Sequence, residues 1–270
     1  MKTHSATHAP RLGLPVATLL IASIVSCVLL VARDWISGSW RQLYLPWNLF
    51  LAWLPLVFAW RATRADAATP SPPAEGGEGR GEEGRQVLNP PISPLVPRGE
   101  RKKSGAPTAD RWRFRAHALA WLLFFPNAPY ILTDLWHLPP NWQSRFWVDL
   151  VLILMFALTG LVLGFLSLYL MQRLVARRFG WVRGWLFTFG IAALSGCGLC
   201  IGRFLRWNSW DVLVNPGELL VDLCTCALRL LEAPRLLVVP VLFAILTFVA
   251  YVLLYALTRL PAPEQPQLAS

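Results

Sequence analysis

Residues Trp147 to Met171 have the sequence WVDLVLILMFALTGLVLGFLSLYLM, with a single charged side chain, Asp149. A helix needs about 20 predominantly apolar residues to cross the hydrocarbon core of a bilayer. An unbroken apolar run of this length, without amphipathic or alternating patterning, is typical of a membrane span. The run therefore predicts an integral membrane protein of the all-α class.

The composition of the whole chain agrees with this interpretation. Of the 270 residues, 55% are hydrophobic and only 15% are charged, whereas soluble domains carry roughly 25% charged residues. The net charge of +10 arises from Lys and Arg that lie mainly between the apolar runs. Basic residues at such positions set membrane topology and contact anionic headgroups. We therefore expect the lipid bilayer as the partner, and not nucleic acid; the oligomeric state stays open.

Five further apolar runs predict a polytopic transmembrane helix bundle with about six spans. The first run has no cleavage pattern and is predicted to be an uncleaved anchor. The third run has a short apolar part, AHALAWLLFF, after which Pro-Asn-Ala-Pro within the run should break the helix; a re-entrant hairpin is the alternative. The five runs cover residues 12–32, 43–60, 116–133, 184–202 and 236–257.

The segments between the runs complete the predicted organisation. Residues 1–60 hold two spans, residues 111–260 hold the other four, and residues 261–270 form a disordered tail. Residues 61–110 contain 8 Pro and 7 Gly and almost no large apolar side chains. Such a composition cannot bury enough surface to fold, which predicts a disordered cytoplasmic loop. Asn215-Pro-Gly-Glu218 has the pattern of a helix start with a capping Asn, and predicts an interfacial helix before the last span.

The distribution of basic residues predicts the orientation. With six spans, 18 Lys and Arg fall on the side of the two termini and 7 on the other side. The predicted loop at residues 172–183 has four Arg in twelve positions and no acid. The positive-inside rule therefore places both termini in the cytoplasm. Most of the 14 Trp fall near the two predicted membrane boundaries, as in an aromatic belt.

Polar side chains remain near the predicted outer boundary, where they must pair or face water. We expect the fold to gather them into one site, with Arg203 or Arg206 paired to acids such as Asp134 and Asp211. The candidate ligand-binding residues are Asn48, Asn127, Tyr130, Thr133, Asp134, His137, Arg203, Arg206, Asn208 and Asp211.

Other chemistry is less well supported by the sequence. Asp134 and His137 lie three residues apart on one helical face, but two ligands are too few for a metal site. The five cysteines, which include CGLC and CTC strings, are explained as small apolar helix residues. Ser195 lies in a string similar to the nucleophile motif of intramembrane proteases, but the sixth span has no His to serve as its base. We expect no metal and no cofactor.

Four strings carry a resemblance to a known family: NLFLAWLPLVFAW, LLFFPNAPYILTDLWHL, FALTGLVLGFLSLYLMQRL and GRFLRWNSWDVLVNP. They resemble a family of bacterial integral membrane proteins, domain of unknown function 1361, over about residues 43–60 and 117–257. The resemblance implies a multi-pass protein of the bacterial cytoplasmic membrane. It brings no activity and no catalytic residues.

Three functions are consistent with these features. The first is binding or transport of a small anion or lipid headgroup on the extracytoplasmic side, because a broken helix beside an Arg and Asp cluster is a usual place for such a site. The second is a membrane enzyme that acts on a lipid-linked substrate, with Asp134, His137 or Asp211 as acid or base. The third is a membrane assembly or scaffold protein without catalysis.

Overall fold

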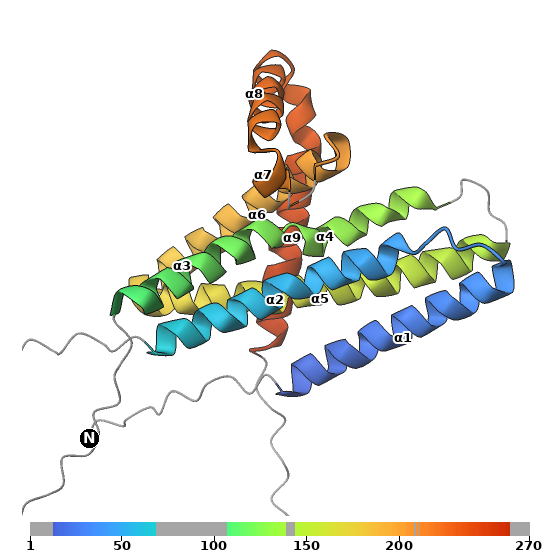
Figure 1. Ribbon diagram of the computed structural model, residues 1–270, viewed down its shortest axis with the longest axis horizontal. Helices are drawn as coiled ribbons and strands as arrows, with labels where there is room; N and C mark the ends of the chain where they lie inside the picture. Colours follow the sequence, from blue (N-terminus) through green and yellow to red (C-terminus); the bar gives the residue numbers. More distant parts are fainter. Residues whose placement is uncertain (1–12, 69–106, 139–143, 208, 210, 260–270) are drawn as a thin grey trace, which may run out of the picture.

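The computed structural model describes residues 13–68, 107–138, 144–207, 209 and 211–259, and every regular element in these segments is a helix. The predicted all-α helix bundle is confirmed. Figure 1 shows α1, α2 and α5 side by side, with α7 and α8 standing away from them. The elements are α1 (Gly13–Ser37), α2 (Tyr44–Ala68), α3 (Pro107–Phe124), α4 (Asn127–Tyr130), the 3₁₀ helix η1 (Ile131–His137), α5 (Ser144–Phe179), α6 (Trp181–Phe204), α7 (Asp211–Val214), α8 (Pro216–Glu232), the 3₁₀ helix η2 (Pro234–Leu237) and α9 (Val238–Leu257).

Within the described residues, four helices are long and apolar enough to cross a membrane. They are α1, residues Phe146–Phe179 of α5, α6, and η2 with α9, and they coincide with the first, fourth, fifth and sixth predicted spans. The second and third predicted spans, α2 and α3, fall short of the same criterion. Asn, Pro and Trp lower the hydropathy of α2, and Arg and His lower that of α3. The total of six spans stays a prediction.

Helix α2 is central to the bundle, although it is less apolar than the four candidate membrane spans. It packs against both α3 and α5. Its buried side chains recur every three or four residues, as required for one face of a helix. Small residues on this face allow close approach of the neighbouring backbones. The buried positions on this face are Leu45, Leu49, Ala52, Leu56, Ala59 and Ala62; Leu51 and Pro55 are buried as well.

Two of the predicted loops differ from the structure. The basic segment 172–183 is not a loop, because α5 continues to Phe179 and α6 begins at Trp181. The turn is reduced to Gly180, whose φ of 95° favours glycine. Likewise the segment 61–110, predicted to be disordered, is helical at both ends, because α2 continues to Ala68 and α3 begins at Pro107. Most of that segment, residues 69–106, and the tail from residue 260 lie outside the described residues.

The third apolar run is broken, as its prolines predict. Helix α3 ends at Phe124, and the chain continues as the short helix α4 and then as η1. The break leaves carbonyl groups at the end of α3 to be satisfied by other groups. Asn127 Nδ2 donates to the Phe124 carbonyl at 3.0 Å, and Ser209 Oγ donates to the Leu123 carbonyl at 3.1 Å.

The broken segment is wedged between two glycine pairs, one on α5 and one on α6. A Cβ added to Gly164 would lie 2.6 Å from Ala128 Cβ, closer than two carbon atoms can approach. Side-chain atoms would therefore prevent α4 from lying against α5, which is the close contact that the Gly-x-x-x-Gly spacing permits. The contacts are Gly160 with Ile131, Gly164 with Ala128, Gly198 with Pro126, and Gly202 with Tyr130.

Helices α6 and α9 pack closely as an antiparallel pair. A Cβ added to Gly196 would lie 2.2 Å from the Pro240 carbonyl oxygen. Further along the pair, Trp185 and Tyr255 rings meet edge to face, with centroids 5.1 Å apart. This packing brings the end of α6 beside the start of α9, where the candidate site lies.

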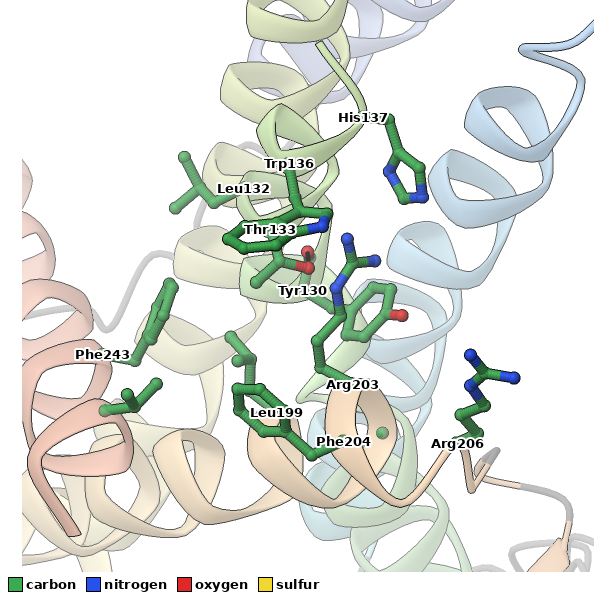
Figure 2. A pocket seen from close by; sticks show the side chains of 12 residues that line it. Tyr130, Leu132, Thr133, Trp136, His137, Leu199, Arg203, Phe204, Arg206 and Phe243 are labelled. Atoms are coloured by element: carbon green, nitrogen blue, oxygen red, sulfur yellow. Dashed lines mark hydrogen bonds between the residues drawn. The ribbon is translucent and has the colours of Figure 1, made fainter. Parts of the chain in front are cut away.

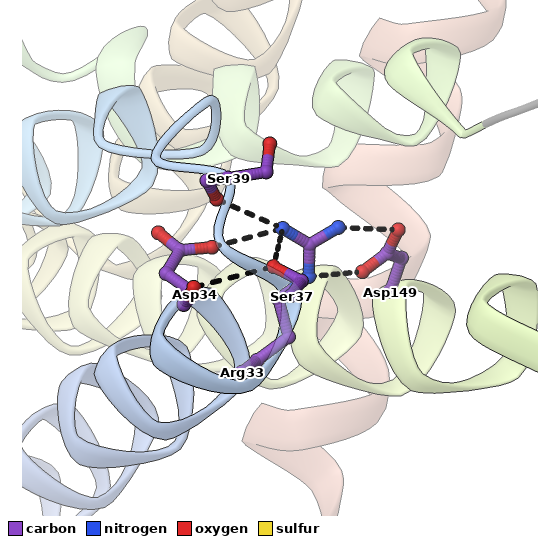
Figure 3. Close-up of polar contacts among 5 residues, drawn as sticks. All are labelled: Arg33, Asp34, Ser37, Ser39 and Asp149. Carbon is purple, nitrogen blue, oxygen red and sulfur yellow. Dashed lines mark hydrogen bonds and ion pairs between the residues drawn. The ribbon is translucent and has the colours of Figure 1, made fainter.

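Helix α1 is anchored to α5 by one arginine (Figure 3). Arg33 Nε and Nη2 donate to the two oxygens of Asp149 at 2.8 and 3.0 Å, and Nη1 donates to Asp34 at 2.9 Å. Asp34 is fully buried and Asp149 nearly so. The single charged residue of the run Trp147 to Met171 is thus paired with an arginine of the first span.

The helix predicted before the last span is α8. Pro216 occupies its first turn, as the pattern predicts. Asn215 lies at the N-cap position but makes no capping hydrogen bond with its side chain, so the predicted cap is wrong in that respect. Trp207 Nε1 instead links the end of α6 to α8 by donating to Asp222 Oδ2 at 2.8 Å.

Candidate functional site

Two adjoining cavities lie where α6 ends and α2 and α9 begin. The first has a volume of about 420 Å³ and a mixed, largely polar lining; the second has about 860 Å³ and a mainly apolar lining. Both volumes fall in the range of roughly 300–1,000 Å³ that ligand sites occupy. We call them the polar cavity and the apolar cavity. Both are lined by Tyr130, His137, Gly202 and Arg203.

Arg203, in the last turn of α6, is the central charged group of the site. Its side chain is only 19% exposed and lines both cavities. Figure 2 shows its guanidinium directed toward η1, near Tyr130 and His137. Among the described residues it makes no hydrogen bond, and its ion pair with Asp134 Oδ1 has a separation of 3.9 Å. The donors of this guanidinium are therefore available to a ligand.

Asp134 lies at the base of the polar cavity and is 1% exposed. Its Oδ2 accepts a hydrogen bond of 2.8 Å from Asn48 Nδ2, which joins η1 to α2. Its Oδ1 lies 3.9 Å from His137 Nδ1 and from Arg203 Nη1. Burial raises the pKa of the Asp134 carboxyl, and the Asn48 hydrogen bond and the charges of His137 and Arg203 only partly oppose that rise.

The other residues of the broken helix contribute in different ways. Asn127 lines the polar cavity, and besides capping α3 it donates to Ser209 Oγ at 3.0 Å. Tyr130 lines both cavities, and its hydroxyl makes no hydrogen bond with the described residues. Thr133 lines the apolar cavity and donates to the Tyr130 carbonyl at 2.7 Å. Tyr130 is thus a second potential donor to a ligand.

The predicted gathering of polar residues therefore occurs in part. Asn48, Asn127, Tyr130, Asp134, His137 and Arg203 line one cavity. Arg206 is exposed and lines only the apolar cavity, and Asp211 on α7 lines neither of the two cavities. Asn208 lies outside the described residues. Asp134 lies 3.9 Å from Arg203, one of the two arginines predicted as its partner.

Several lining residues are absent from the predicted site. Tyr44 and Trp47 open α2 beside Asn48, and the Tyr44 ring lies 5.0 Å from the His137 ring between centroids. Trp207 and Ser209 come from the segment after α6. Ser209 is adjacent in sequence to a predicted candidate and carries a hydroxyl, so the string around it contained a signal. Tyr44 and Trp47 carry no such signal, because Tyr and Trp are common at any membrane boundary.

The described residues contain no group of three or more His, Cys, Asp or Glu side chains arranged to hold a metal ion. The five cysteines are free thiols. Ser195 is buried on α6, and its hydroxyl has no hydrogen-bond partner among the described residues. Among the described residues, no His accepts a hydrogen bond from Ser195 as a general base would.

These features define a helical, multi-pass membrane protein with a buried arginine between a polar and an apolar cavity. The chain belongs to the family described as protein of unknown function (DUF1361), whose model matches residues 97–256. The family match confirms the resemblance found in the sequence, although it begins after α2. It includes α3 to α8 and nearly all of α9, and so every cavity-lining residue except those of α2.

No curated protein and no solved structure matches the chain. The site must therefore be interpreted from its own geometry.

Proposed function

We propose that the protein binds, and in doing so retains or transports, a small anion or anionic lipid headgroup at Arg203. The observation that carries this proposal is the state of the guanidinium: it is largely buried, faces two cavities and makes no hydrogen bond with the described residues. A guanidinium has five donors in a planar fork that matches carboxylate and phosphate oxygens. Desolvated donors without partners are costly, so a ligand that accepts from them should bind with a large gain.

The charges around Arg203 favour an anion over a cation. Asp134 is the acid closest to it, but the 3.9 Å separation is too long for a hydrogen bond. Because burial raises the pKa of Asp134, its negative charge is disfavoured and leaves Arg203 less neutralised. Tyr130 adds a hydroxyl donor on the wall of the same cavity.

Anion-dependent stabilisation of the purified full-length protein tests this proposal. Phosphate, sulfate or a short carboxylate at 100 times its Kd should stabilise the fold by about 2.7 kcal/mol. Arg203→Ala should abolish the effect, and Arg203→Lys should retain part of it as a point charge. Arg177→Ala is the matched control, because Arg177 is an exposed arginine at the other end of α5. Equal stabilisation of wild type and Arg203→Ala would contradict the proposal.

The second candidate function is acid–base catalysis on a lipid-linked substrate. It is favoured by the buried carboxyl of Asp134, whose pKa is raised, and by its proximity to His137. A raised carboxyl pKa is the property of a general acid. In that case Asp134→Asn should remove turnover of the substrate and leave anion binding intact, whereas a pure binding protein would show no turnover in either form.

We further propose that the cavities open on the extracytoplasmic side of a bacterial cytoplasmic membrane, with both termini in the cytoplasm. The support is the concentration of basic residues at the opposite end of the bundle, where Arg177 and Arg178 close α5. In a variant without the native cysteines, Trp136→Cys should react with an impermeant reagent in intact cells and Arg177→Cys should not. The reverse labelling pattern would show that the cavities open toward the cytoplasm.

A further inference from the structure

We propose that the anionic group bound at Arg203 carries an aliphatic chain, and that this chain lies in the apolar cavity between η1, α6 and α9. The natural ligand would then be an anionic lipid or another acyl-chain amphiphile rather than a free ion. This inference rests on the proposed anion binding and identifies the class of ligand. Its basis is the continuity of two cavities with different linings.

The two cavities are parts of one site because they share their boundary residues. Arg203 and Tyr130 line both cavities, and so does Gly202. A Cβ at Gly202 would lie 3.4 Å from the Tyr130 ring, so even a methyl group would fill the space there. A ligand held by Arg203 in the polar cavity can therefore extend directly into the apolar one.

The lining of the apolar cavity fits a hydrocarbon chain. Leu199 lies four residues before Arg203 on α6 and so projects from the same helix face. Leu132 and Phe243 stand opposite it, from η1 and α9, as Figure 2 shows. Apart from Arg203, charged side chains enter this cavity only from Arg206 and, when protonated, His137. A polar extension of the ligand would lose hydration along the walls formed by Leu132, Leu199 and Phe243, which offer no hydrogen-bond partner in return.

The rim of the apolar cavity gives access from the bilayer. Phe204, 66% exposed, and Val239, 37% exposed, line the cavity and also face outward. Trp136, 84% exposed, is a third rim residue. Phe204 and Val239 lie at the ends of two helices that are apolar enough to cross a membrane, α6 and the segment Pro234–Leu257. A lipid can therefore enter sideways, with its chain still in apolar surroundings and its headgroup toward Arg203.

The experiment compares three probes on the full-length protein in a neutral maltoside detergent. The probes are inorganic phosphate, octyl phosphate below its micellar concentration, and octanol. Each buried methylene adds about fourfold to affinity, and detergent competes for part of that gain. We expect octyl phosphate to bind at least tenfold more tightly than phosphate, and octanol to bind without saturation.

Three variants distinguish binding of the aliphatic chain from binding of the anionic group. Val239→Trp places a large side chain in the apolar cavity and should remove the gain of octyl phosphate, with phosphate binding unchanged. Val241→Trp is the matched control, because Val241 is on the same helix, 49% exposed, and lines neither cavity. Arg203→Ala should remove binding of both phosphate probes.

The outcomes distinguish the inference from the proposed function. If phosphate and octyl phosphate bind equally well and both depend on Arg203, the inference of a bound aliphatic chain is wrong. The proposed anion binding is then still supported. If octyl phosphate binds equally well to wild type and Arg203→Ala, it is bound as a detergent and the inference is also wrong. If neither phosphate probe binds to the wild type, the proposed function itself fails.

Discussion

Replacement of Arg33 should destabilise the protein more than replacement of its partner Asp149. Arg33 is the only cation in contact with two buried carboxylates, Asp34 and Asp149, among the described residues (Figure 3). One Asp34 oxygen already has no hydrogen-bond partner there. Arg33→Met would leave both carboxylates buried without a counter-charge. Asp149→Asn would leave the arginine paired with Asp34.

The expected magnitudes follow from the geometry. Removing one member of a buried ion pair costs about 3–5 kcal/mol, because the remaining charge stays buried. The side chains are 15%, 6% and 0% exposed for Arg33, Asp149 and Asp34, so solvent compensates little. We expect a loss of about 4 kcal/mol for Arg33→Met. Asp149→Asn loses a charge-assisted hydrogen bond, worth about 1.5–3 kcal/mol.

Thermal unfolding of the purified protein in detergent measures the difference. At roughly 2–4 °C per kcal/mol, Arg33→Met should lower Tm by about 8–16 °C. Asp149→Asn should lower it by roughly half as much. Arg41→Met is the control and should have little effect, because Arg41 is exposed in the segment that connects α1 to α2. A larger loss for Asp149→Asn than for Arg33→Met would refute the reasoning.

Three further outcomes test the packing and the site. Gly196→Ala should lower Tm, because its Cβ would lie 2.2 Å from the Pro240 carbonyl oxygen and overpacking costs about 1–3 kcal/mol; Gly190→Ala, with open space at its Cβ, should not. Arg206→Gly should raise Tm by relieving a φ of 60°, worth about 1 kcal/mol; a lower Tm would contradict this. Because burial raises the pKa of Asp134, its contribution to stability is present at low pH and is lost as pH rises through that raised value. The Tm of the wild type minus the Tm of Asp134→Asn should therefore decrease as pH rises from about 4. An increase in this value would contradict the prediction.

Hydropathy predicts much of this fold because the bilayer imposes length and apolarity on each span. That rule located α1, α5, α6 and α9. It could not locate the ends of α5, since Arg177 and Arg178 are as stable in a helix terminus as in a loop. For α2 it gives the apolar run 43–60 but not the buried face, which is decided by packing against α3 and α5.

The predicted depth of a residue in the membrane indicates which polar residues lie at the same level. It does not indicate which of them form pairs. Asn48, Asp134 and Arg203 come together as depth requires, because each lies near one end of its helix. Asp149 lies at the same end, yet it pairs with Arg33 of α1. A carboxylate at a given level can reach any neighbouring cation, so the choice depends on which helices are adjacent. Adjacency is a property of the packed bundle and is not encoded locally.

Glycines on α5 and α6 link the packing of the helices to the geometry of the site. Sequence alone could not distinguish glycines that pack helices from glycines that are common in membranes. In the structure Gly164 and Gly198 receive Ala128 and Pro126, so the broken helix fits between α5 and α6. Because the helix is broken there, Asn127 caps α3 and the chain turns Asp134 inward toward Arg203. The site thus depends on residues without side chains: closing those contacts with larger residues would displace α4 and separate the charged pair.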